Sequence, residues 1–211
     1  MALELFEGSA GAGVVGAVDE GAEWHLAERC LAATPEDGAR GMFFQGVVGV
    51  VGFLQGEAAG AQCLEASGLR ELNPAELYPV TRFLAMTSRA TRLLRPQLGN
   101  WAQSLHYIGT QATVDFLASM FGRELMQAAR RDPRLLLQHL ADGYRTAVSY
   151  GERSVLWTGD RSARFVMRRD FMPAPYHEGV LLGAMEAVGA QDVRVHGRQL
   201  SLLDTEYDVS W

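Results

Sequence analysis

Lysine is absent from this sequence, and all 19 basic residues are arginine. Arginine suits bidentate recognition of anions, but a compositional habit of the source genome explains the bias equally well, so we give it no functional weight. Cysteine is scarce: Cys30 and Cys63 form no Cys-x-x-Cys pair and are too few for a disulfide scaffold. The net charge of −6 disfavours a dedicated nucleic-acid-binding protein, which needs a cationic surface.

Targeting and membrane segments are lacking as well. Glu4 and Glu7 follow Met1, where a secretory leader would carry basic residues and then an apolar run. No uninterrupted apolar stretch reaches the roughly 20 residues that a membrane-spanning helix needs. We therefore expect a cytoplasmic protein without a membrane span. The composition, 48% hydrophobic and 21% charged over 211 residues, suits a single folded domain at residues 1–211.

The usual catalytic signatures do not occur in the sequence. It has no phosphate-binding loop, no dinucleotide fingerprint and no nucleophile elbow, so we expect no enzyme activity and no cofactor. The histidines have no paired metal-binding spacing, and we interpret them as surface or half-buried residues. His106 is the exception, because it lies mid-helix among apolar residues, where a single axial haem ligand could come from. The five histidines are His25, His106, His139, His177 and His196.

The clearest pattern that is present lies at the C-terminal end. From Leu203 to Trp211, polar residues fill the even positions and mostly apolar ones the odd positions. Successive side chains of a strand point to opposite faces, so this alternation predicts a strand with one buried face. Turn residues at 158–161 and two prolines before residue 176 complete a ββαββ unit at 151–211. Its predicted elements are strands at 154–157 and 164–167, a helix at 176–188, and a strand at 192–195 that turns at 196–198 into the last strand.

The part before this unit, residues 23–150, has helical periodicity. Residues 1–22 are rich in glycine and alanine and are predicted to form an arm or a strand. Residues 42–54 are apolar on almost every side, which is typical of a buried core helix and also of a dimer interface. The predicted fold class is α+β, an N-terminal helical group packed on a C-terminal ββαββ antiparallel sheet unit. Helices are predicted at 23–33, from Thr34 onward, at 42–54, at 57–67, from Asn73 to Pro96, and at 101–121, 123–131 and 132–149.

The decapeptide at 144–153 joins the two parts and holds two tyrosines, two arginines and a glutamate. One interpretation is an anion or polar-headgroup site built from Arg145, Arg153 and the tyrosine hydroxyls. The other is a buried hinge in which Arg153 pairs with Glu152 or a nearby acid. Both interpretations stay open at the level of sequence.

Two smaller features also allow a structural and a functional interpretation. Arg168, Arg169 and Asp170 follow a predicted strand and are expected to form a solvated strand end, in which Arg169 can pair with Asp170. Cys63 is a lone thiol on a predicted helix. Such a thiol can be acylated, but most buried lone cysteines are simply small hydrophobic residues, and we expect the second for Cys63.

Five runs of the sequence carry a resemblance to known proteins: Arg40–Phe44, Tyr144–Arg153, Arg169–Pro173, Gly179–Leu181 and Leu203–Trp211. Over residues 23–211 they resemble an uncharacterised paralogous family expanded in myxobacteria. More widely, several helices, a hairpin, a helix and a second hairpin occur here in one order. This order is similar to the superfamily shared by haem–nitric-oxide-binding (H-NOX) domains, 4-vinyl-reductase domains and the small subunits of the TRAPP tethering complex.

The resemblance implies an apolar pocket between helices and sheet, and a homodimer or paralogue heterodimer formed through the early helices. It implies no catalytic residue. The haem-binding branch has an axial histidine followed by a Tyr-x-Ser-x-Arg set that clamps the propionates. Here Tyr144 is followed by Thr146 and Val148, so that clamp is absent. The vinyl-reductase branch often has cysteines in its C-terminal half, and this chain has none there.

We therefore expect a non-enzymatic domain that senses a small hydrophobic ligand or binds a protein partner. The alternatives are a haem-based gas sensor that uses His106, a purely structural dimerisation module, and an enzyme acting on a hydrophobic substrate. No nucleophile–base pair in the sequence supports the last of these. The predicted ligand-binding residues are Phe83, Phe116, Met120, Tyr144, Arg145, Tyr150 and Arg153.

Overall fold

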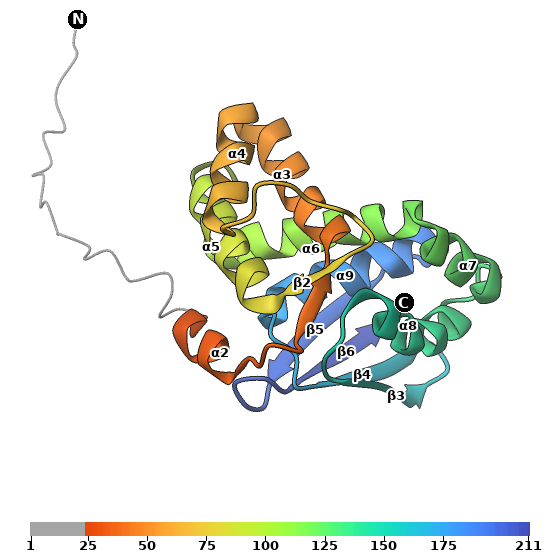
Figure 1. Cartoon of the computed structure of the whole chain (residues 1–211). Helices are drawn as coiled ribbons and strands as arrows, with labels where there is room; N and C mark the ends of the chain where they lie inside the picture. Colours follow the sequence, from red (N-terminus) through yellow and green to blue (C-terminus); the bar gives the residue numbers. More distant parts are fainter. Residues whose placement is uncertain (1–23) are drawn as a thin grey trace, which may run out of the picture.

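Helices dominate residues 24–147, and an antiparallel sheet unit follows (Figure 1). The structure is a computed structural model that describes residues 24–211, so the arm or strand predicted at 1–22 lies outside the described residues. The predicted α+β fold class is confirmed. In chain order the elements are α2 (Leu26–Ala32), β1 (Gly38–Arg40), α3 (Gly41–Gln55), α4 (Glu57–Ala66), β2 (Leu77–Pro79), α5 (Val80–Leu98), α6 (Trp101–Ala118), α7 (Met120–Ala129), α8 (Pro133–Ala147), β3 (Glu152–Gly159), β4 (Ser162–Arg168), α9 (Ala174–Ala187), β5 (Arg194–Gln199) and β6 (Thr205–Ser210).

The four-stranded sheet has the order β3-β4-β6-β5, and each neighbouring pair is antiparallel. The alternation predicted for β6 is confirmed, because Thr205, Tyr207 and Val209 are buried and the residues between them are not. Side chains of α8 and α9 pack on this buried face. The opposite face carries ion pairs such as Arg164 to Asp208, with 2.8 Å between Nε and Oδ1. The sheet therefore has one apolar face toward the helices and one charged face.

Two connections differ from the sequence-based prediction. β5 continues through the turn predicted at 196–198. The chain turns later, where the main-chain N–H of Leu200 donates to the carbonyl oxygen of Asp204 (2.8 Å). The helix predicted from Thr34 is also wrong. The carboxylate of Asp37 accepts a hydrogen bond from the main-chain N–H of Thr34 (2.7 Å) and closes a turn, after which the chain enters β1.

Helix boundaries are set by capping side chains and by the small β1–β2 pairing. The helix predicted from Asn73 begins only at Val80, because the residues before it form β2 and pair with β1. The next predicted helix is divided at Ser119, whose hydroxyl accepts from the N–H of Gly122 (3.1 Å) and caps α7. Asp132 caps α8 as predicted, since its carboxylate accepts from the N–H two residues on (2.8 Å).

The apolar helix α3 is buried on one face and exposed on the other. Phe44, Val47 and Val51 are buried, which confirms the core-helix interpretation for that face, whereas Phe53 is 85% exposed. Cys63 on α4 is fully buried, and burial raises its thiol pKa to about 11, as suits a small hydrophobic residue. No helix within residues 24–211 is both long enough and apolar enough to span a membrane.

The buried side chains of the described residues form two hydrophobic clusters. The first lies among α2 to α6 and includes Phe44, and the second lies between α7 to α9 and the sheet and includes Phe165. Phe43 and Val180 pack against both clusters. In Figure 1 the two helices α6 and α9 lie between the early helices and the sheet, which places them at this junction.

The contact between α6 and α9 depends on two glycines. A Cβ atom on Gly109 would collide with the main-chain carbonyl oxygen of Tyr176, and one on Gly179 would collide with that of His106. The two backbones therefore approach each other more closely than side chains would allow. Gly183, one turn further along α9, has room, because its Cβ would lie 3.4 Å from the Cβ of Thr113.

We predict that Gly179→Ala lowers the free energy of unfolding by about 1–3 kcal/mol, because the methyl group forces α6 and α9 apart. Gly183→Ala is the matched control on the same helix, and it should leave stability unchanged or raise it slightly through better helix propensity. Urea unfolding followed by circular dichroism measures both. Equal stability of the two variants would contradict the close helix contact.

Candidate functional site

A cavity of about 60 Å³ lies where the two hydrophobic clusters meet. Phe43 and Val180, which pack against both clusters, line it together with Phe83 of α5 and Phe116 of α6. Its volume is several times the roughly 10–15 Å³ that one ordered water needs, and far below the roughly 300 Å³ of a small drug pocket. Most of the wall is aliphatic or aromatic, so the cavity suits a small apolar molecule.

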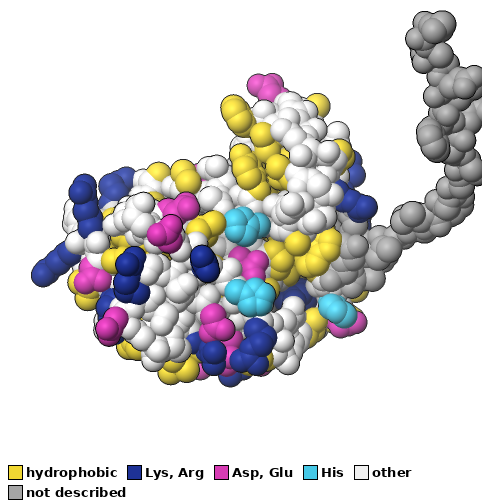
Figure 2. Space-filling model, turned by 180° about the vertical axis from the view of Figure 1, so that it is seen from behind, with side chains coloured by type: hydrophobic (Ala, Val, Ile, Leu, Met, Phe, Trp, Pro, Cys, Tyr) yellow, Lys and Arg dark blue, Asp and Glu magenta, His cyan; other side chains and the backbone are white. Residues whose placement is uncertain are grey.

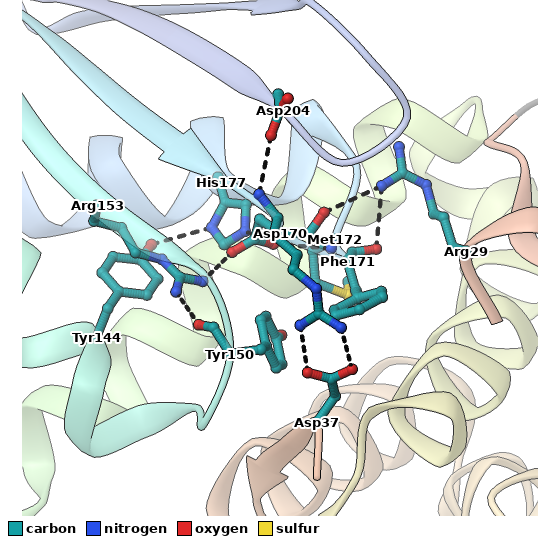
Figure 3. Close-up of polar contacts among 11 residues, drawn as sticks. Arg29, Asp37, Tyr144, Tyr150, Arg153, Asp170, Phe171, Met172, His177 and Asp204 are labelled. Carbon is teal, nitrogen blue, oxygen red and sulfur yellow. Dashed lines mark hydrogen bonds and ion pairs between the residues drawn. The ribbon is translucent and has the colours of Figure 1, made fainter. Parts of the chain in front are cut away.

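One wall of the cavity is polar and centres on the carboxylate of Asp170, whose side chain is 3% exposed (Figure 3). Its Oδ1 accepts hydrogen bonds from Nε2 of His177 (2.7 Å) and from the main-chain N–H of Met172 (2.9 Å). Its Oδ2 accepts from Nη2 of Arg153. A buried carboxylate is tolerated only when it is paired and hydrogen-bonded, and these three donors meet that requirement.

His177 uses both of its ring nitrogens. Nε2 faces Asp170, and Nδ1 lies 3.0 Å from the hydroxyl oxygen of Tyr144. With Asp170 ionised, Nε2 carries hydrogen. In a neutral ring the Tyr144 hydroxyl then donates to Nδ1, and in a protonated ring Nδ1 donates to the hydroxyl oxygen. The rings of Tyr176 and Tyr207 lie edge-on to the imidazole, so it is enclosed from α9 and from β6 as well.

Arg153 of β3 holds the polar wall together. Its Nη2 donates to Asp170, and its Nη1 donates to the main-chain carbonyl of Tyr150. The guanidinium carbon also lies 4.9 Å from the ring centre of Tyr144 and 5.4 Å from that of Tyr150. The side chain is 3% exposed, yet its Nε atom has no hydrogen-bond partner in the described part of the chain. One buried donor on the cavity wall is therefore unused.

The segment around Asp170 joins the sheet to the N-terminal part of the chain. Arg169 has a φ of 51°, a left-handed conformation that is uncommon for a side-chain-bearing residue. Its guanidinium pairs with both oxygens of Asp37, with 2.7 Å between Nη2 and Oδ2. Arg29 of α2 donates to the main-chain carbonyl of Phe171 (3.3 Å). Figure 3 shows these contacts on either side of Asp170, so residues of the N-terminal part hold the segment before and after the aspartate.

Burial and neighbouring charges set the protonation states of Asp170, Tyr144 and Tyr150 in the polar wall. Burial alone would raise the pKa of Asp170, but the nearby His177 and Arg153 hold it well below its ordinary value. Burial raises the pKa of the Tyr144 and Tyr150 hydroxyls well above the ordinary value, and the charge of Asp170 adds to the effect. At neutral pH the site therefore holds an ionised aspartate and protonated tyrosines.

Five of the seven predicted ligand-binding residues line the cavity and two do not. Met120 is 58% exposed at the start of α7. The side chain of Arg145 is 80% exposed and pairs with Asp142 (3.6 Å), because it follows the buried Tyr144 by one residue and so points to another side of α8. The residues that line the cavity are Phe83, Phe116, Tyr144, Tyr150 and Arg153. A ligand-binding role for them stays a prediction.

Two expectations for polar residues are wrong. Arg169 pairs with Asp37 rather than with Asp170, and Asp170 is buried rather than at a solvated strand end. His177 is also buried, not a surface or half-buried residue. The hinge interpretation of residues 144–153 expected a buried Arg153 paired with an acid, and the structure identifies that acid as Asp170, not Glu152.

The sequence contains one signal that could have located the buried pair. Asp170 is followed by Phe171, Met172 and Pro173, an apolar run that can draw the aspartate into the core, and an aspartate buried there needs a charged or hydrogen-bonding partner. His177 follows seven residues later, close enough in sequence to meet the carboxylate where the chain turns into α9.

Comparison with protein-family models gives a match over residues 32–211 to "Protein of unknown function (DUF2378)". The chain belongs to the DUF2378 family. This confirms membership of an uncharacterised family. The match includes all of the residues that line the cavity and the Arg169–Asp37 pair. No curated protein matches the chain at a significant level.

Solved structures with a similar fold are H-NOX proteins, as the order of elements predicted. The unliganded Fe(II) H-NOX protein from K. algicida is 12% identical with a TM-score of 0.64, and the match covers 81% of this chain and 95% of that one. A mutant H-NOX protein from S. oneidensis is also 12% identical, with a TM-score of 0.62 and the same coverage. An oxygen-binding H-NOX domain related to soluble guanylate cyclases is 13% identical (TM-score 0.59, coverage 81% and 92%). At these identities the likeness shows the fold alone.

A haem of the H-NOX kind does not fit the site of this DUF2378 protein. The cavity of about 60 Å³ is far smaller than a porphyrin requires. His106 is half-buried on α6 and is not among the residues that line the cavity. His177 does line it, but both of its ring nitrogens are hydrogen-bonded. Among residues 24–211 no group of three or more metal-binding side chains comes together.

We predict that Asp170→Asn lowers the free energy of unfolding at pH 7 by about 3–5 kcal/mol, because it leaves the Arg153 charge buried without its partner. The native pKa of Asp170 is depressed, so its stabilising effect is complete above the unfolded value of about 3.9 and is lost as pH falls toward the native value. The gap between wild type and variant should therefore narrow below about pH 4. Denaturant titrations at pH 7, 5 and 3 measure it.

Asp142→Asn is the matched control, because Asp142 is an exposed aspartate that also pairs with an arginine. It should change stability by less than about 1 kcal/mol at each pH. A similar effect of the two substitutions would show that the Asp170 pair contributes no more than a surface ion pair.

Proposed function

We propose that this DUF2378 protein is a non-enzymatic domain that binds a small apolar molecule in the cavity between its helices and its sheet. The observation that carries the proposal is the position of the cavity, at the junction of the two hydrophobic clusters and with a single polar wall. Small-molecule sites are typically concave and mostly apolar, with a few placed polar groups that fix orientation. The fold shared with H-NOX proteins is consistent with ligand sensing.

A ligand in this cavity would touch both halves of the chain at once. Phe83 and Phe116 belong to the helical group, Tyr144 lies near the end of α8, and Arg153 belongs to the sheet. A molecule that contacts all of them favours the arrangement in which they are closest together. Binding would then shift the population of that arrangement, or of a partner-bound state that requires it, without bond chemistry.

The electrostatics of the polar wall favour binding over catalysis. Tyr144, His177 and Asp170 have the order of a nucleophile, a base and an orienting acid. However, burial raises the pKa of Tyr144, which disfavours a reactive phenolate, and Arg153 already balances the charge of Asp170. The same contacts suit a wall that keeps its shape when the cavity is filled.

A second copy or a paralogue is the partner that we propose, with the early helices as the interface. α3 and α6 flank a groove of about 520 Å³ that is lined by Met42, Gly46 and the exposed Phe53. Figure 2 shows hydrophobic side chains on the protruding end of the molecule that α3 and α4 form. An exposed aromatic residue beside glycines on one helix can pack against the same surface of another copy.

The cavity is tested by filling it. Gly143 lies on α8 at the cavity wall, and a methyl group there would lie 3.9 Å from Phe116, within ordinary contact. We predict that Gly143→Ala raises the free energy of unfolding by about 0.5–1 kcal/mol and weakens binding of xenon, an apolar atom that enters dry cavities. Gly183→Ala adds the same methyl group to α9 at a residue that does not line the cavity, and it should leave xenon binding unchanged. Xenon-129 NMR titration measures binding.

Two results would count against the ligand-binding proposal. If wild type binds no xenon, the interior is closed in solution, and the chain is better explained as a structural module. If both alanine variants bind xenon as wild type does, the binding site lies elsewhere than this cavity.

The proposed dimer interface is tested by a substitution of Phe53. We predict that wild type sediments as a dimer at micromolar concentration and that Phe53→Ser sediments as a monomer with unchanged thermal stability, because the side chain is exposed in the single chain. Leu31→Ser alters an equally exposed residue on α2 and should leave the dimer intact. A dimer that survives Phe53→Ser would place the interface elsewhere.

A further inference from the structure

Two helices each carry a stripe of uncharged residues on a face that the rest of the chain does not bury. None of the residues in either stripe is buried, and along each helix they follow one another at intervals of four, three and four. This spacing keeps side chains on one face of a helix, and it is the spacing by which two helices pack along a shared seam. The stripes are Met42, Gly46, Gly49 and Phe53 on α3 and Tyr107, Gln111, Val114 and Ala118 on α6.

The stripes follow the two sides of the groove between α3 and α6. All of their residues except Val114 line the groove, and Val114 is 55% exposed. Among the described residues that line it, Asp115 alone carries a charge. Its Oδ1 already accepts from Nε2 of Gln111 in the same chain (3.1 Å). An exposed apolar surface with so few charged residues is typical of the centre of a protein–protein interface.

The helices α3 and α6 run in roughly opposite directions along the groove. Gly46 lies against Asp115, because a Cβ atom on the glycine would collide with Oδ2 of the aspartate. Two turns later on α3, Phe53 lines the groove together with Tyr107, which lies two turns earlier on α6. The midpoints of the two stripes therefore lie at nearly the same level in the groove.

The groove has large side chains at one end and small residues toward the other. The rings of Phe53 and Tyr107 belong to the same end, and Gly46 and Ala118 belong to the opposite end. At Gly49 a Cβ atom would meet nothing within 4 Å, so the space over the middle of α3 is open. Such a surface is complementary to itself once it is turned by 180°, because each large residue then meets a place where there is room.

We propose that a second copy of this chain packs on the groove through a twofold axis that crosses both helices at the midpoints of their stripes. Each of the two helices then lies antiparallel on the same helix of the other copy. This inference rests on the proposed function, which places a partner on the early helices, and it names the contacts by which two identical chains meet. A second copy is favoured because its own surface supplies the seam spacing and the order of large and small residues that the groove requires.

On α3 the axis passes between Gly46 and Gly49. Gly46 of one copy then faces Gly49 of the other, and without side chains at these positions the two backbones can approach each other closely. On either side of the glycines, Phe53 lies on Met42 of the second copy. A thioether against an aromatic ring is a favourable contact, and it covers the 85% exposed ring of Phe53.

On α6 the axis passes between Gln111 and Val114. Tyr107, which is 38% exposed in the single chain, then lies on Ala118 of the second copy, whose small side chain leaves room for the ring. Gln111 lies beside Val114 of the second copy. The contact therefore covers both stripes and requires no charged group from the partner.

A pair of charge variants tests the register. Phe53→Arg and Met42→Glu should each be monomeric at micromolar concentration, because each places a charge in an apolar contact on both sides of the axis. Mixed in equal amounts they should form a one-to-one dimer, at least about tenfold tighter than either variant alone, since the introduced guanidinium then faces the introduced carboxylate. Native mass spectrometry resolves the mixed dimer, and sedimentation gives the affinities.

Met120→Glu is the matched control for Met42→Glu. It makes the same change in a methionine that is 58% exposed and does not line the groove. It should dimerise alone as wild type does, and it should not draw Phe53→Arg into a mixed dimer.

The glycines give a second measurement that does not depend on the folding of the half-buried Met42 variant. Gly49→Ala should weaken the dimer by at least about tenfold, because its methyl group separates the two backbones at the axis. Gly52→Ala adds the same methyl group to α3 at a residue that does not line the groove, and it should leave the dimer unchanged. In the single chain a Cβ atom at either glycine meets nothing within 4 Å, so both variants should fold as wild type does.

The outcomes separate this inference from the proposed function. Wild type that stays monomeric at micromolar concentration overturns both the twofold contact and the proposed dimer. A dimer that Phe53→Ser disrupts and Gly49→Ala leaves intact keeps the proposed interface and overturns the register. Two folded charge variants that stay monomeric after mixing also overturn the register. If Met42→Glu does not fold, the comparison of the two glycine variants decides.

Discussion

The buried carboxylate of Asp170 is the interaction on which the rest of the structure depends. It accepts from Arg153 of β3, from His177 of α9 and from the main chain at Met172, and so ties the first strand of the sheet to the helix that crosses its buried face. Its neighbour Arg169 reaches Asp37 at the entrance to β1. Ionic groups buried in this way rarely raise stability over an apolar core of the same shape, but they allow one arrangement and penalise others.

That arrangement explains why a cavity can persist beside a polar cluster. Asp170, His177 and Tyr144 satisfy one another, so they need no water from the cavity, and the remaining wall stays apolar. The exception is the Nε donor of Arg153. The H-NOX proteins share the fold of this chain, yet a fold does not determine what a site binds. Here the cavity is small and both ring nitrogens of His177 are hydrogen-bonded, which disfavours haem at this place.

Local patterns in the sequence predicted the helices and strands whose conformation depends mainly on residues close by in the chain. The alternation before Trp211 gave β6, and the Asp-Pro pair at Asp132 gave the start of α8, because side-chain period and capping act within a few residues. The aromatic residues of the cavity were also found, since Phe83 and Phe116 lie on apolar helix faces. The β1–β2 pairing was missed because its partners are separated by a long stretch of chain. The Asp170 site was missed for another reason: Arg153 lies on another strand and His177 on the next helix, and the sequence favoured a pair with the adjacent arginine.

The most direct test of the central claim is the ionisation of Asp170 itself. The ¹³C chemical shift of its carboxyl carbon, followed by NMR in the intact chain from pH 7 downward, reports when the group takes up a proton. If His177 and Arg153 hold the carboxylate as the structure shows, the shift stays constant through the ordinary range of an aspartate, around pH 4, and moves only at more acid pH. A midpoint at or above that range would contradict the buried ion pair and the cavity wall built on it.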